Sequence, residues 1–107
     1  LREVINCGGE NISPRAVDEV LMDHPAVAQA VTFALPLPKL GEDVAAAVVL
    51  RDNADIEAAE IRKFTQERLA AFKVPRKILI LDEIPKGATG KLQRIGLHEK
   101  LGLAESA

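Results

Sequence analysis

The chain has 107 residues, 48% hydrophobic and 28% charged, which is the composition of an ordinary globular protein with one domain and one modest core. Its formal net charge of -2 argues against a generally basic surface for nucleic acid. The single cysteine excludes an intrachain disulfide, and no apolar run approaches the roughly 18–20 residues of a membrane span.

The sequence begins at Leu1 without an initiator methionine, a signal peptide or a polar lead-in, so we expect it to be a piece of a longer protein. Residues 1–5 predict a short edge strand. Residues 6–11 predict a turn-rich loop, because the adjacent Gly8 and Gly9 permit positive φ and a close approach of the backbone to other groups.

A first helix is predicted to begin at Ser13-Pro14, with serine as the N-cap and proline at the first helical position. Apolar residues at i, i+3 and i+4 give this helix one apolar stripe; they are Val17, Val20 and Leu21. His24-Pro25 is expected to stop it.

Two strands should follow. Residues 26–35 are apolar or small, with Val27, Val31 and Phe33 expected on one face. Residues 36–43 contain two prolines and a glycine and predict a loop. Residues 44–50 are all apolar, which is typical of a central strand buried on both sides.

The remaining elements are a polar turn at 51–55, an amphipathic helix at about 57–71, a core strand at 78–81 and a last short helix at 94–101. Gly102 is expected to end that helix. These elements predict the α+β class: a small sheet with helices packed on it and two exposed glycine-bearing loops.

The loop at 85–91 carries Lys86 and Lys91 beside two glycines, a combination suited to an anionic ligand. It is not a phosphate-binding Walker A loop, because Pro85 replaces the first glycine and Leu92 replaces the hydroxyl residue. The pattern alone leaves open a solvated loop with surface lysines.

Residues 83–94, Glu-Ile-Pro-Lys-Gly-Ala-Thr-Gly-Lys-Leu-Gln-Arg, closely resemble the last signature motif of the adenylate-forming superfamily. That superfamily comprises acyl-CoA synthetases, adenylation domains of peptide synthetases and beetle luciferases. Gly87 replaces the usual threonine. The resemblance implies that Lys91 is catalytic and contacts ATP and the substrate carboxylate during adenylation.

Residues 2–14 look like the motif that follows the interdomain hinge of the same superfamily. By that resemblance, Gly8 and Gly9 face the pantetheine arm of CoA, where a side chain would obstruct the thiol. From the residues alone, a tight turn that merely leads into the first helix remains an alternative.

The resemblance covers residues 1–103 and implies that 1–107 is a single C-terminal domain with a mainly antiparallel sheet, separated from its N-terminal adenylation domain. The implied enzyme is an acid–thiol ligase, an acyl-CoA synthetase, of fatty acid metabolism. It converts ATP, a carboxylic acid and CoA to acyl-CoA, AMP and pyrophosphate, and is inactive as this fragment. ATP, CoA and Mg²⁺ would be bound mainly by the missing domain. The implied partners are the N-terminal adenylation domain and the carboxylic acid substrate. The implied location is the cytoplasm.

Two rival functions are an adenylation domain that loads a carrier protein and a non-catalytic module that binds phosphate or nucleic acid; the net charge disfavours the latter. Cys7 is interpreted as a partly buried small hydrophobe rather than a nucleophile. His24 and His98 are not spaced with it for a metal site.

Overall fold

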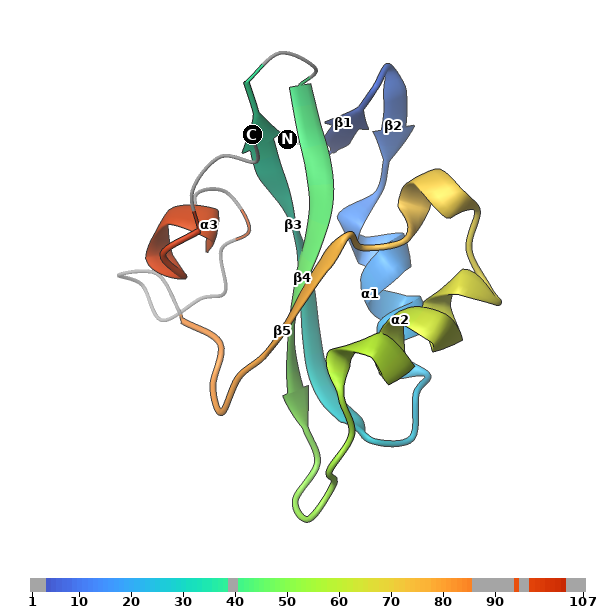
Figure 1. The fold of residues 1–107 in the computed structure, drawn as a ribbon, viewed down its shortest axis with the longest axis vertical. Coiled ribbons are helices and arrows are strands. Elements are labelled where there is room, and N and C mark those ends of the chain that lie inside the picture. The colour runs from blue at the N-terminus through green and yellow to red at the C-terminus, as the bar shows by residue number, and fades with distance from the viewer. Residues whose placement is uncertain (1–3, 39–40, 86–93, 95–96, 104–107) are drawn as a thin grey trace.

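The computed structural model describes residues 4–38, 41–85, 94 and 97–103, and Figure 1 shows their arrangement. A central sheet has helices on both faces. In chain order the elements are β1 (Ile5–Cys7), β2 (Glu10–Ile12), α1 (Pro14–Met22), β3 (Val27–Leu37), β4 (Gly41–Leu50), α2 (Ala58–Gln66), the 3-10 turn η1 (Ala71–Lys73), β5 (Lys77–Ile80) and α3 (Leu97–Lys100).

Strand β4 is the centre of the five-stranded sheet. It pairs antiparallel with β3 along nearly its whole length, antiparallel with β1 at its beginning, and parallel with β5. Strand β2 extends the sheet beyond β1. The predicted α+β class with a small, mainly antiparallel sheet is therefore confirmed.

The core divides into two clusters, one on each face of β4, because successive side chains of a strand point to opposite faces. Helices α1 and α2 cover the first cluster, and α3 covers the second (Figure 1). Cluster one includes Ile5, Ile12, Val17, Leu21, Val44, Ala46, Val48 and Ile61. Cluster two consists of Val31, Phe33, Leu35, Ala45, Ala47, Ile84 and Leu97. The prediction that residues 44–50 form a strand buried on both sides is confirmed over its first five residues.

The first helix begins as predicted. The hydroxyl of Ser13 accepts a hydrogen bond from the backbone N–H of Ala16 at 3.3 Å, and Pro14 occupies the first turn, where a missing N–H costs nothing. Val17 and Leu21 are fully buried against the sheet, so the apolar stripe lies where the spacing predicted it.

The prediction for β3 is partly wrong. Val31 and Phe33 share a face in cluster two, but Val27 belongs to cluster one on the opposite face. The register shifts between Val27 and Gln29. Such an irregularity adds a residue to one strand and reverses the alternation of side chains beyond it.

Residues 5–12 form a hairpin, not the predicted loop after an edge strand. Positive φ at Gly8 (60°) and Gly9 (90°) gives the tight two-residue turn that suits two twisted strands. This allows Asn6 to pair with Asn11, and Cys7 with Glu10. Because β1 pairs with both β2 and β4, it is an inner strand and the edge prediction is wrong.

The predicted loop at 36–43 is mostly strand. Pro36 pairs in register with Glu42, and Leu37 with Gly41. A proline is tolerated here because it lies in a strand at the edge of the sheet, where a missing N–H breaks no ladder. Helix α2 ends earlier than predicted, since the amides of both Arg68 and Leu69 bond to the Thr65 carbonyl. The last helix, predicted over 94–101, is described over Leu97–Lys100, and Arg94 and Leu101 lie outside it.

Candidate functional site

The turn of the β1–β2 hairpin is fixed through its backbone. The side-chain oxygen of Asn6 accepts a hydrogen bond from the Gly9 N–H at 3.1 Å. The N–H of Asn6 donates to a carboxylate oxygen of Glu42 on β4 at 3.0 Å. A Cβ atom built on Gly8 or on Gly9 would meet nothing within 4 Å. These two hydrogen bonds therefore hold the backbone of the turn, while the space that side chains at Gly8 and Gly9 would occupy is open.

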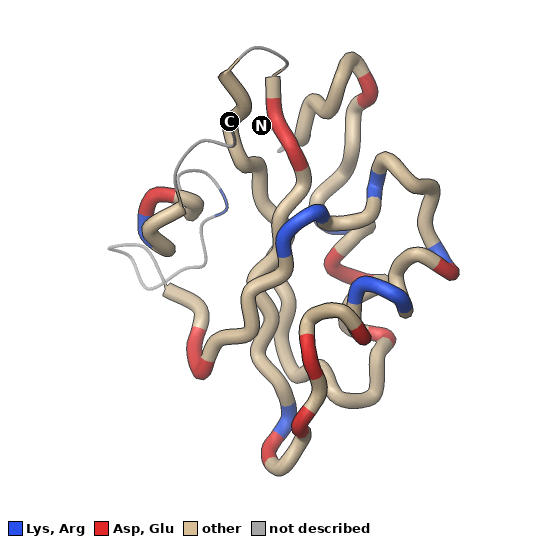
Figure 2. The backbone as a smooth tube through the Cα atoms, in the orientation of Figure 1, with Lys and Arg blue, Asp and Glu red and all other residues tan. Residues whose placement is uncertain are grey.

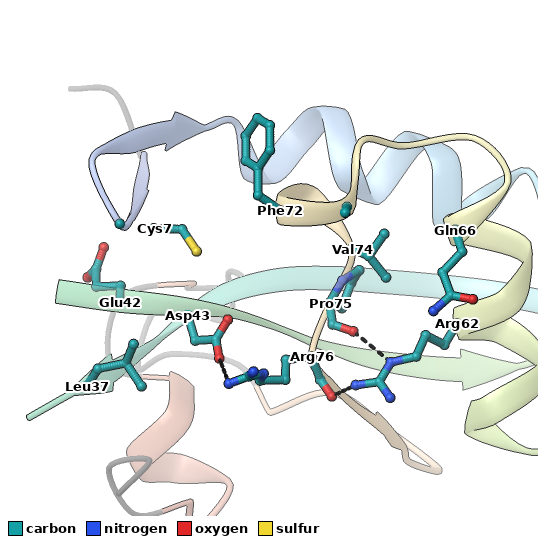
Figure 3. Close-up of a pocket in the computed structure, with 12 residues that line it drawn as sticks. Cys7, Leu37, Glu42, Asp43, Arg62, Gln66, Phe72, Val74, Pro75 and Arg76 are labelled. Carbon is teal, nitrogen blue, oxygen red and sulfur yellow. Dashed lines mark hydrogen bonds and ion pairs between the residues drawn. The ribbon is translucent and has the colours of Figure 1, made fainter. Parts of the chain in front are cut away.

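A pocket of about 430 Å³ lies beside this turn. Figure 3 shows that it is built from the end of β1, the beginning of β4, helix α2 and the segment that includes η1. Its wall combines apolar side chains, Leu37, Phe72 and Val74, with the charged Asp43 and Arg76. The pocket thus offers both apolar contact and a cation beside Gly8.

One of the two arginines that line this pocket, Arg76, is paired with a buried acid. Asp43 is 8% exposed and accepts a hydrogen bond from the Val44 N–H through Oδ1 at 2.9 Å. Its Oδ2 is buried without a hydrogen bond, and the Arg76 guanidinium, with Nη1 at 3.3 Å, compensates its charge. The Arg76 side chain is still 71% exposed, so it remains accessible to an anionic ligand.

Cys7 lines the same pocket but is poorly suited to be a nucleophile. Burial raises the pKa of its thiol, the Asp43 carboxylate raises it further, and Arg76 opposes this increase. The reactive form of cysteine is the thiolate, which this setting disfavours. The structure thus agrees with the interpretation of Cys7 as a partly buried small residue.

Arg62 of α2 holds the far wall of the pocket. Its guanidinium donates to the carbonyl of Pro75 at 3.2 Å and to the carbonyl of Arg76, as Figure 3 shows. Two donors from one rigid fork fix the backbone that carries Phe72 and Arg76. The residue types alone assign no role to Arg62, Phe72 or Arg76, because their proximity to Gly8 depends on long-range packing.

Lys91, the predicted adenylation lysine, lies outside the described residues, as do Lys86 and the glycines between them. The described chain leaves the core at Ile84, which is 2% exposed. It is described again at Arg94, whose Nη1 lies 2.6 Å from Oδ2 of Asp18. The structure therefore places the Gly8–Gly9 turn and the two ends of the lysine segment, but not the lysine itself.

Acidic and basic residues are both spread along the described chain (Figure 2), with short runs of one sign such as the acids from Asp52 to Glu60. Within that part of the chain, no group of three or more His, Cys, Asp or Glu residues is arranged to hold a metal ion. No described helix is long and apolar enough to span a membrane.

His24 has a structural role. Its Nδ1 accepts a hydrogen bond from the Ala26 N–H at 3.0 Å, and its ring contacts the ring of Phe64.

Comparison with protein families matches residues 16–91 to the AMP-binding enzyme C-terminal domain. A probable CoA ligase of Humulus lupulus, CCL9, is 49% identical over 94 residues, covering 88% of this chain and 18% of that protein. An oxalate–CoA ligase of Arabidopsis thaliana is 47% identical over the same shares of the two chains. The chain thus spans about a fifth of the length of the curated relatives that it matches.

Two solved structures are similar to this chain in both fold and sequence. A fatty acyl CoA synthetase of Mycobacterium tuberculosis superposes with a TM-score of 0.78 at 34% identity, over 91% of this chain and 19% of that one. The amide bond synthetase McbA of Marinactinospora thermotolerans gives a TM-score of 0.83 at 32% identity, over 94% of this chain and 20% of that one. Each matches one part of a larger protein.

Proposed function

Because this chain belongs to the AMP-binding enzyme C-terminal domain family of the adenylate-forming superfamily, we propose that it is the smaller domain of an AMP-forming acyl-CoA synthetase. The complete enzyme activates a carboxylic acid with ATP to give an acyl-adenylate and pyrophosphate. It then transfers the acyl group to the thiol of CoA and releases AMP. The 107 residues alone do not catalyse this reaction, because the acyl and nucleotide pockets belong to the N-terminal domain.

Lys91 serves the first half-reaction. A carboxylate that attacks the α-phosphate of ATP brings two anions together, and negative charge grows on the phosphoryl oxygens in the transition state. An ammonium group placed beside these oxygens stabilises that charge, typically by several kcal/mol in a site that excludes water. A lysine can deliver this charge on a long, flexible side chain.

The Gly8–Gly9 turn serves the second half-reaction by lining the passage for the pantetheine arm. The observation that carries this proposal is the open space above both glycines, next to a pocket with an apolar wall. Arg76, largely exposed at that pocket, can contact the phosphates of CoA. A side chain on the turn would occupy the passage without disturbing any described neighbour within this domain.

The two sites are attached to opposite faces of the sheet. The hairpin packs through Ile5 and Ile12 into cluster one, whereas Ile84 and Leu97, which flank the lysine segment, belong to cluster two. A rotation of the whole domain between half-reactions, of the hinged kind known in many enzymes, exchanges one site for the other at the active centre.

We assign Mg²⁺, which accompanies ATP, mainly to the N-terminal domain. The acceptor is proposed to be free CoA because CCL9 and the Arabidopsis enzyme are named as CoA ligases. A carrier-protein acceptor is the alternative. Assaying the complete enzyme with CoA and with a pantetheinylated carrier protein separates the two.

The proposed role of Lys91 is tested in the complete enzyme with Lys91→Ala. Adenylate formation, measured as ATP–pyrophosphate exchange, is expected to fall at least ~100-fold. Thioester formation from a supplied acyl-adenylate should keep most of its rate, because that step does not require the lysine. Lys63→Ala, on the exposed face of α2, is the matched control and should change neither step. Equal loss of both half-reactions in Lys91→Ala contradicts the division of labour.

A further inference from the structure

Three residues from distant parts of the chain meet at the edge of the sheet beside β3. Asp18 lies on α1, Thr32 lies in β3, and Arg94 directly follows the segment 86–93. Oδ1 of Asp18 accepts a hydrogen bond from the Thr32 N–H at 2.6 Å. Arg94 donates through Nη1 to Oδ2 of Asp18 at 2.6 Å and to the Thr32 carbonyl at 3.2 Å. We call this set the edge cluster.

The side chains of Asp18 and Arg94 bond to backbone groups of β3 that a neighbouring strand would otherwise pair with. In the described sheet β3 pairs with β4, so its other side presents backbone N–H and C=O groups that need partners. At Thr32 the carboxylate of Asp18 takes the N–H, and the guanidinium of Arg94 takes the C=O. Both side chains are largely buried, 14% exposed for Asp18 and 18% for Arg94, so the hydrogen bonds are partly shielded from water.

This cluster also joins the two layers that the sheet separates. Helix α1 covers cluster one, whereas the chain on both sides of residues 86–93 is tied to cluster two through Ile84 and Leu97. Arg94 crosses from the second layer to reach Asp18 in the first. The three peptide units from Lys91 to Arg94 span at most about 11 Å, so Arg94 bounds the region that Lys91 can occupy.

We propose that Asp18 and Arg94 are positioning residues for adenylation: their ion pair fixes the base of the lysine segment to the edge of β3 and thereby sets where Lys91 is delivered. This role rests on the proposed function of Lys91. In this proposal both residues act through Lys91 and not by contact with the reactants. Catalysis by a positioned charge is sensitive to small displacements, and a shift of about 1 Å can cost on the order of 100-fold in rate.

The described chain also contains an ion pair between two sequence neighbours, which serves as a control. Arg68 and Glu67 lie 3.4 Å apart on the surface, with side chains 44% and 62% exposed. Exposed pairs of this kind contribute little to stability. Neutralising Glu67 therefore controls for the general loss of one acid–arginine contact in the same domain.

The test uses the complete enzyme with Asp18→Asn, Arg94→Gln and the control Glu67→Gln. For the first two variants we expect kcat for adenylate formation to fall at least ~10-fold, with KM for ATP and thioester formation from supplied acyl-adenylate changed less than ~3-fold. Arg94→Lys, which keeps the charge and one donor nitrogen, should recover part of the lost rate. Glu67→Gln should match the unmodified enzyme in both steps.

A second measurement separates positioning from general destabilisation. In a Lys91→Ala background, adding Arg94→Gln should cause no further loss of adenylation, because no lysine remains to be positioned. If Lys91→Ala lowers adenylation as expected but Asp18→Asn and Arg94→Gln leave it unchanged, the positioning role is wrong and the proposed function stands. An additional loss in the double variant, or equal losses in both half-reactions, also overturns it. If Lys91→Ala itself has no effect on adenylation, the proposed function fails and the positioning role fails with it.

Discussion

The β1–β2 turn and the base of the lysine segment are held in place by different means. The turn is fixed mainly through its backbone, by hydrogen bonds at the amides of Asn6 and Gly9, and the two glycines leave the space above it open. The lysine segment is bounded by side chains, a buried Ile84 on one side and the ion pair of Arg94 with Asp18 on the other.

This difference follows from what each loop contributes in the proposed function. A passage for a ligand requires the absence of atoms, which a glycine turn with fixed backbone provides. A catalytic charge requires one side chain at a defined place, which requires firm attachment at the base of its segment. The turn should therefore be sensitive to added volume, and the lysine segment to loss of contacts at its base.

The largest expected effect is on stability, at the base of the lysine segment. Ile84→Ala removes a side chain that is 2% exposed in cluster two and should lower the free energy of unfolding by about 2–4 kcal/mol. Urea denaturation measures this. Ile80→Ala, at a position 38% exposed on β5, is the control and should lose much less. Similar losses in the two variants would mean that Ile84 does not anchor the segment.

The next effect concerns the open space above the turn. Gly8→Asn adds a side chain at this position, and asparagine tolerates the positive φ of 60° there better than most residues do. In the complete enzyme, thioester formation from supplied acyl-adenylate should slow on the order of 10- to 100-fold. ATP–pyrophosphate exchange should remain within about threefold. Unchanged kinetics with CoA would reject the assignment of this turn to the pantetheine passage.

A smaller effect is expected from the support beneath the turn. Glu42→Ala removes the acceptor of the Asn6 N–H, and one net hydrogen bond contributes about 0.5–1.5 kcal/mol. Amide hydrogen exchange should accelerate severalfold at Asn6 and stay unchanged at Thr32, whose N–H bonds to Asp18. Acceleration at both amides would show that the two regions are not held independently.

The smallest effect is a pH dependence at Cys7. Because burial raises the pKa of this thiol in the folded chain, folding favours its protonated form. This contribution to stability is present below the pKa of the unfolded chain and is lost as the pH rises through the higher folded value. Alkylation by iodoacetamide should accordingly reach its half-maximal rate at a higher pH in the folded chain than in urea. Coinciding pH profiles would contradict the burial of the thiol.

Local sequence signals predicted the elements that short-range chemistry decides. Ser13-Pro14 set the beginning of α1, and the unbroken apolar run set the centre of β4. The hairpin at 5–12 was missed because its polar residues have low strand propensity, whereas pairing with β4 stabilises it. The face of Val27 was misjudged because nothing in the sequence marks the register shift before Gln29.

In the candidate site, too, the sequence shows the local features but not the long-range contacts. The glycine pair is visible in the sequence as a motif, and the structure adds its open surroundings. The contacts of Arg94 with Asp18 and of Arg62 with the backbone of Pro75 join residues far apart in the chain. Their types alone give no partner, because many exposed charges look the same in sequence.

The most direct test of the two-site account is a structure of the complete enzyme in two states. With a non-hydrolysable acyl-adenylate analogue and no CoA, the Lys91 ammonium should lie within hydrogen-bond distance, about 3 Å, of the phosphate or carboxyl oxygens, with the Gly8–Gly9 turn away from the reacting centre. With CoA bound, the turn should line the pantetheine arm and Lys91 should have withdrawn. An amine remote from both ligands in the first state would contradict the account.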